Sequence, residues 1–93
     1  MLTLNSTLLI PPHVTFTFVD GDAVLLNTRT NKYFALEEVG AHLWELLKDS
    51  QTLEAAYQTL LEEYEVEPVE LERDIIELVD RLVENELVEL VQE

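Results

Sequence analysis

Two histidines and many carboxylates are the residues of this chain that could carry chemistry. His13 and His42 are expected in different elements, and neither has a carboxylate at the spacing of a metal site. The acidic residues follow the pattern of solvated helix faces and lack the Asp-x-Asp-x-Asp-Gly order of a calcium-binding loop. We therefore predict that both histidines are ordinary surface or boundary residues and that there is no metal site.

Composition argues against other kinds of catalytic centre. The 93 residues include no cysteine, which excludes a thiol nucleophile and a disulfide. The 2 glycines, Gly21 and Gly40, are too far apart to form a glycine-rich phosphate loop. The sequence therefore predicts a protein that is not an enzyme and uses no cofactor, and whose role is to bind a partner.

Charge is the most unbalanced property of the chain. It has 20 acidic and 5 basic residues, a net charge of −15, and 14 of the acidic residues follow position 50. Solvated helix faces explain this excess, and so does attraction of a cationic partner. Either way a nucleic-acid partner is disfavoured, because phosphate binding needs Lys and Arg. The missing cysteines and the lack of a signal or anchor segment favour a cytoplasmic location without membrane contact.

The first half of the chain has the alternation of a three-stranded meander. Val14–Val19 alternates large apolar residues with Thr, and Ala23–Asn27 is more uniformly apolar, as in a central strand. The third strand is Lys32–Leu36, and turns are expected at Asp20–Asp22 and Thr28–Asn31. Residues 1–13 fit either an extra strand or a flexible arm, and the sequence leaves both open.

The second half has the period of three helices. The first contains Val39–Leu47, the second begins after a Thr52 cap, and the third runs from Pro68 to about Asn85. Leu87–Leu90 is expected to be a short extended piece. We predict one domain over residues 1–93, of α+β class, with a three-stranded antiparallel sheet followed by three α-helices.

The third helix carries more apolar surface than a core stripe needs. Its ordinary core stripe consists of Leu71, Ile75, Leu78 and Leu82. Ile76, Val79 and Val83 widen this stripe to an arc of roughly 160°. Either the rest of the domain covers this extra flank, or the flank is the wall of an open groove.

The order of these segments resembles the PqqD-like family, the small domains called RiPP recognition elements. The resemblance rests on "LLNTRTNKYFALEEVGAHLWELL", "TLEAAYQTLLEEYEVEP" and "ERDIIELVDRLVENELV", and covers more than three quarters of the chain. Three positions depart from the family pattern: Asn31 replaces a common turn glycine, Glu37 replaces a common helix cap, and "NEL" replaces Gly-Leu after the last helix. Within the family, the first segment is most similar to stand-alone leader-peptide-binding proteins of lasso peptide biosynthesis.

The resemblance implies a winged-helix-like fold that binds the leader of a ribosomally made precursor peptide. The leader would add antiparallel to the third strand and lie in a groove beside the third helix. Phe34 and Leu36 should point toward the helices, and Tyr33 and Ala35 away from them. The predicted peptide-binding residues are Lys32, Tyr33, Phe34, Ala35, Leu36, Glu72, Asp74, Ile75, Ile76, Val79, Leu82, Val83 and Glu86.

The implied partners are a precursor leader peptide and the leader peptidase or modifying enzyme that receives it. The protein itself would be a monomer, or a homodimer in the absence of leader. Alternatives are a chaperone for a radical-enzyme pathway such as pyrroloquinoline quinone assembly, a winged-helix DNA-binding protein, and a dimeric adaptor. The acidic third helix argues against the DNA-binding alternative.

Overall fold

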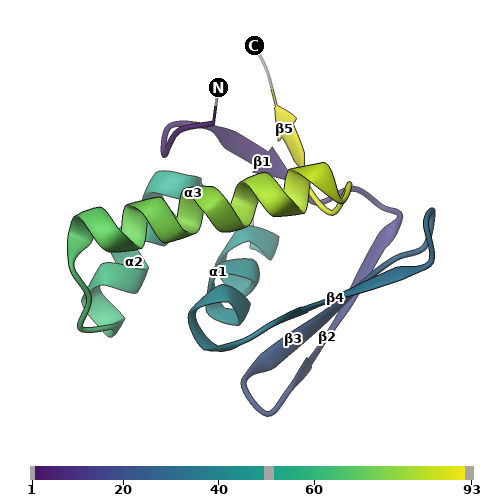
Figure 1. Ribbon diagram of the computed structural model, residues 1–93, viewed down its shortest axis with the longest axis horizontal. Helices are drawn as coiled ribbons and strands as arrows, with labels where there is room; N and C mark the ends of the chain where they lie inside the picture. Colours follow the sequence, from purple (N-terminus) through teal and green to yellow (C-terminus); the bar gives the residue numbers. More distant parts are fainter. Residues whose placement is uncertain (1, 50–51, 92–93) are drawn as a thin grey trace.

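The computed structural model describes residues 2–49 and 52–91. Within them the chain forms two antiparallel sheets and three helices (Figure 1). The elements are β1 (Thr7–Leu9), β2 (Val14–Val19), β3 (Asp22–Asn27), β4 (Lys32–Leu36), α1 (Glu38–Lys48), α2 (Leu53–Glu63), α3 (Pro68–Glu84) and β5 (Glu89–Val91). The described residues thus confirm the α+β class and the three-stranded antiparallel sheet with three helices, and they add a two-stranded sheet.

Two turns set the register of the meander β2-β3-β4. Asp20 and Gly21 have φ values of 50° and 86°, which fit a type I′ turn, the kind whose twist suits a two-residue hairpin. In the second turn Asn31 has a φ of 61°, the left-handed conformation that asparagine tolerates better than most residues. The replacement of a common family glycine by Asn31 is therefore accommodated in the backbone.

The open side of β4 is an unpaired sheet edge. A type I′ turn directs the N–H of the first β3 residue toward β2, and every second β3 residue repeats that orientation. The intervening β3 residues face β4, where they oppose Lys32, Phe34 and Leu36. By the same alternation, Tyr33 and Ala35 direct their backbone N–H and C=O groups away from β3. No strand in the described part of the chain pairs with that side of β4.

The first and last strands of the described residues pair with each other. Leu8 lies opposite Leu90 in the antiparallel pair β1–β5, which Figure 1 shows apart from β4. The stretch for which the sequence allowed a strand or a flexible arm thus contains a strand, and its partner is β5. Because this strand belongs to the second sheet, it leaves the outer side of β4 uncovered.

The core lies between the helices and one face of the meander. Trp44 of α1 is 0% exposed, and the ring of Phe16 from β2 meets it edge-on with centroids 5.6 Å apart. From α3 the core receives Leu71, Ile75, Val79 and Leu82. These buried side chains pack α3 into the common core, where it contacts α2, and so fix the position of α3 beside β4.

The helices begin as the sequence predicts. The Thr52 hydroxyl accepts a hydrogen bond from the Ala55 N–H at 3.1 Å and so caps α2, and Pro68 occupies the first turn of α3. By contrast, Glu37 precedes α1 without a side-chain cap hydrogen bond. Among the described residues, no helix has both the length and the apolar character that crossing a membrane requires.

Candidate functional site

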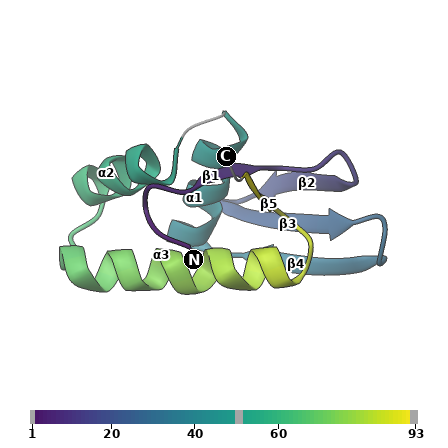
Figure 2. The ribbon, with the colours of Figure 1, turned by 90° about the horizontal axis from the view of Figure 1, so that it is seen from above.

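A groove of about 890 Å³ lies between β4, the start of α1, the loop before α3, and α3 itself. Figure 2 shows the flanking elements, with α3 and β4 on the same side of the molecule. The floor of the groove is apolar, and carboxylates and one guanidinium stand around it. The apolar lining residues are Phe34, Ala35, Leu36, Val39, Gly40, Leu43, Val66, Leu71, Ile75 and Leu78; the charged ones are Glu37, Glu65, Glu67, Glu70, Asp74 and Arg81.

One stripe of α3 supplies the helical wall of this groove. Leu71, Asp74, Ile75, Leu78 and Arg81 line it, and their spacing of three or four residues places them along one side of a helix. Leu78 is only partly buried, so its side chain is available to a ligand. The stripe combines apolar surface with charges of both signs, a composition suited to a peptide and not to a small apolar molecule.

An abrupt transition from β4 to α1 supplies the opposite wall. Only Glu37 separates the two elements, and Glu38 takes a φ of 43°, a left-handed conformation that costs a non-glycine residue about 1 kcal/mol or more. This sharp turn brings Gly40 close to both neighbouring walls. A Cβ on Gly40 would lie 3.4 Å from Leu78 Cδ2 and 3.7 Å from Leu36, so the absence of a side chain there keeps the floor of the groove open.

The structure brings five of the predicted site residues together in the groove: Phe34, Ala35, Leu36, Asp74 and Ile75. Three others, Lys32, Tyr33 and Glu86, line a smaller pocket of about 140 Å³ beside the start of β4. Tyr33 is 72% exposed and Phe34 is half-buried, as expected for side chains on opposite faces of the strand.

Two predicted groove residues, Val79 and Leu82, lie in the core instead. Their side chains are 0% and 1% exposed and, unlike Ile75, are not among the residues that line the groove. Apolar period alone does not distinguish the buried centre of a wide stripe from its two flanks. Both are therefore removed from the proposed contact set.

The remaining predictions on α3 fall on its other flank. Ile76 is half-buried, Val83 is 36% exposed, Glu72 is exposed, and none of them lines the groove. At about 100° per residue, Leu78 and Arg81 lie on the opposite side of the core stripe from Ile76 and Val83. Sequence reasoning placed Leu78 in the ordinary core stripe and omitted Arg81. Which flank of α3 faces the groove depends on where β4 packs, and this tertiary contact cannot be read from the period of the helix.

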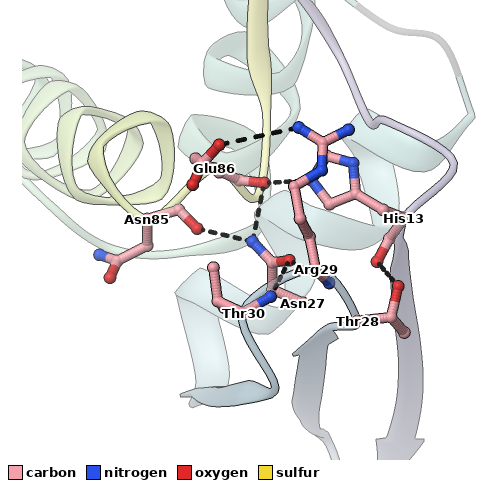
Figure 3. A network of polar contacts seen from close by, with 7 residues as sticks. All are labelled: His13, Asn27, Thr28, Arg29, Thr30, Asn85 and Glu86. Carbon is pink, nitrogen blue, oxygen red and sulfur yellow. Dashed lines mark hydrogen bonds and ion pairs between the residues drawn. The ribbon is translucent and has the colours of Figure 1, made fainter.

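A polar network ties the β3–β4 turn to the end of α3 (Figure 3). The buried Asn27 amide donates hydrogen bonds to the carbonyl oxygens of Asn85 and Glu86, at 3.0 and 3.2 Å. Its side-chain oxygen accepts from the Arg29 N–H at 2.9 Å. His13 Nε2 contacts the same Glu86 carbonyl at 2.9 Å. The network thus fixes the turn that starts β4 relative to the C-terminal end of α3.

Replacing Asn27 with Leu should therefore loosen the site as well as the fold. Leu has a similar volume but leaves two carbonyls and two backbone N–H groups without this partner, so we expect the free energy of unfolding to fall by about 2–3 kcal/mol. Urea denaturation measures this change. Thr28→Ala is a matched control, because it removes one exposed hydrogen bond to the His13 carbonyl and should cost below about 1 kcal/mol. An equal loss of unfolding free energy in both variants would contradict the stabilising role assigned to Asn27.

His42 lies outside the groove, in a side-chain contact that the sequence did not reveal. Its Nδ1 is 3.2 Å from a Glu63 carboxylate oxygen and 3.4 Å from the Tyr64 hydroxyl. The contact joins α1 to the end of α2 across 21 positions of sequence, a separation that local spacing rules do not detect.

The fold and this site define the class of protein. Residues 22–88 match the family described as coenzyme PQQ synthesis protein D (PqqD), and the chain belongs to that family. The resemblance noted from the sequence is confirmed. No curated protein matched the sequence significantly.

Two solved structures narrow the comparison. One, TbiB1 in complex with the TbiA(beta) leader peptide, is 30% identical, with a TM-score of 0.85, and the match covers 91% of this chain and 99% of that one. The other, a lasso peptide synthetase B1 complexed with the leader peptide, is 32% identical with a TM-score of 0.80, over 89% of this chain and 98% of that one. This chain is thus similar along nearly its whole length to two proteins solved with leader peptides, one of them a lasso peptide synthetase B1.

Proposed function

We propose that this protein is a non-catalytic recognition subunit that binds the leader segment of a ribosomally made precursor peptide in a lasso peptide pathway. The observation that carries the proposal is the open side of β4 running beside a groove with an apolar floor. Both similar structures are leader-peptide complexes, which supports the same ligand class here. Precursors of this kind are made on ribosomes, so the proposal places the protein in the cytoplasm.

The leader would bind as an additional antiparallel strand. Backbone N–H and C=O groups of Tyr33 and Ala35 would form its main-chain hydrogen bonds, giving affinity that depends little on sequence. Apolar or aromatic side chains of the leader would enter the groove over Phe34, Ile75 and Leu78 and supply selectivity. Lys32 and Glu86 would flank the segment that leaves past the start of β4.

The expected affinity follows from the task of a carrier. A protein that passes its peptide on should bind it with a Kd in the nanomolar to micromolar range, about −8 to −12 kcal/mol. Ordering an extended leader costs several kcal/mol, so burial of the apolar anchors must offset this cost and supply the remaining binding free energy. The receiving peptidase or modifying enzyme would then act on a segment held in one register.

A titration tests this proposal directly. The probe is a fluorescently labelled peptide copied from the leader of the precursor gene nearest to the gene of this protein. We expect saturable 1:1 binding with a Kd between about 1 nM and 10 µM. Failure of this leader to bind at 100 µM would contradict the proposed function.

The alternatives lead to different measurements. A winged-helix-like layout also suits DNA binding, but α3 carries Glu70, Glu72, Asp74, Glu77, Asp80 and Glu84 against Arg73 and Arg81, and would repel phosphate. A homodimer paired through β4 would compete with the leader, so its measured mass should fall toward that of one 10.7 kDa chain plus one leader when leader is added. A chaperone for pyrroloquinoline quinone assembly would bind that pathway's precursor more tightly than a lasso leader.

A further inference from the structure

The charges around the groove are distributed unequally along its length. Glu65 and Glu67 stand in the loop before α3, Glu70 in its first turn and Asp74 one turn later, all lining the groove. Arg81 is the basic residue of this lining and lies nearest the C-terminal end of α3. One end of the groove is therefore strongly negative and the other carries a positive charge.

Neighbouring residues preserve this difference. Arg73 is 4.0 Å from Glu70 and 3.8 Å from Asp74, but all three side chains are about 60% exposed, so water screens these pairs. At the other end, Arg81 shares the surface of α3 with Glu77, Asp80 and Glu84. The charges of Glu84 and Glu86 are offset there by Lys32, which lines the same small pocket, and by Arg29, which lies 3.8 Å from Glu86. The acidic end thus keeps an uncompensated excess of carboxylates.

The direction of β4 decides which end of a bound peptide meets the acidic end of the groove. β4 begins beside Glu84–Leu87, at the end of α3, and its last residue, Leu36, lies near Gly40 and the middle of α3. It therefore runs opposite to α3, and a peptide added antiparallel to β4 runs the same way as α3. The N-terminal part of that peptide meets Glu65, Glu67 and Glu70, and its C-terminal part meets Arg81.

We propose that the groove selects leader segments by the order of their charges, with Lys or Arg N-terminal to the apolar anchors and Asp or Glu C-terminal to them. This inference rests on the proposed function. Glu70 and Arg81 are eleven residues apart on α3, which is about 16 Å at 1.5 Å per residue. An extended peptide spans that distance in about five residues. The preferred leader thus carries a basic residue about five positions before an acidic one.

Two peptides of identical composition test the proposal. Both derive from the leader used above. One carries two lysines N-terminal to its apolar anchors and a glutamate C-terminal to them, five residues after the lysines. In the other, the lysines and the glutamate exchange places. At 20 mM salt we expect the first to bind about tenfold more tightly, because each exposed ion pair contributes a factor of about 1.4 to 5. At 1 M salt, where the Debye length is about 3 Å, the difference should fall below about twofold.

A charge-exchanged protein provides the matched control. Glu70→Lys combined with Arg81→Glu leaves the net charge unchanged and should remove most of the preference between the two peptides, because Glu65, Glu67 and Asp74 remain at the first end. Equal affinities of the two peptides for the natural protein, with both bound, would overturn the charge-order proposal and leave the proposed function standing. Failure of both peptides to bind would overturn the two together.

Discussion

Leu78→Asp weakens leader binding by about 100-fold or more, according to this account of the groove. Leu78 lines the groove from α3 and is partly exposed, so it contacts the ligand without being a fully buried core residue. A carboxylate there removes an apolar anchor contact and adds a charge that the bound peptide would desolvate. Losses of about 2–4 kcal/mol are typical of such central interface positions, and each 1.4 kcal/mol is a factor of ten. Fluorescence titration with the labelled leader measures the change.

Val83→Asp is the control for this substitution. It places the same charge on the same helix at a side chain that is 36% exposed and outside the groove, and we expect an affinity within about threefold of the natural protein. Circular dichroism melting of both variants separates loss of binding from loss of fold. If Leu78→Asp remains folded and binds the leader normally, the groove is not the binding site.

Tyr33→Pro removes a backbone donor on the open side of β4 and should weaken binding by about 30-fold or more. Proline has no N–H, and its ring occupies the space where the peptide strand would approach. The Tyr33 N–H points away from β3, so the β3–β4 ladder keeps its hydrogen bonds. The same leader titration measures the loss.

Tyr33→Thr controls for the lost ring. It keeps the N–H and a residue that favours strands, and because Tyr33 is 72% exposed on the face away from the helices we expect at most about a threefold change. If the proline and threonine variants bind equally well, main-chain pairing at β4 does not contribute to recognition.

Local patterns in the sequence were sufficient to predict the meander and the helices. Alternation identifies β2, the turn signals at Asp20-Gly21 and Asn31 agree with their positive φ values, and the Thr52 cap forms as expected. Glu86 also has a positive φ, of 58°, at a place where the family pattern has glycine. These features depend on a few adjacent residues, and they can therefore be predicted from the sequence.

The details of the groove depend on contacts between distant segments and were only partly predictable. Asp74 and Ile75, both predicted to contact the peptide, line the groove, whereas Val79 lies in the core and Leu78 lines the groove. A rotation of α3 by one residue, about 100°, separates these two assignments. The pairing of β1 with β5 is equally non-local, and it matters because it leaves the open side of β4 free of the chain's own N-terminal strand.

Amide hydrogen exchange at β4 tests the central claim most directly. In the free protein the Tyr33 and Ala35 N–H groups face away from β3 and should exchange rapidly, as should Phe18 N–H on the opposite edge of the sheet. With saturating leader, NMR of ¹⁵N-labelled protein should show Tyr33 and Ala35 exchanging at least about tenfold more slowly and Phe18 unchanged. Unchanged exchange at Tyr33 and Ala35 while the leader is bound would contradict strand addition at β4.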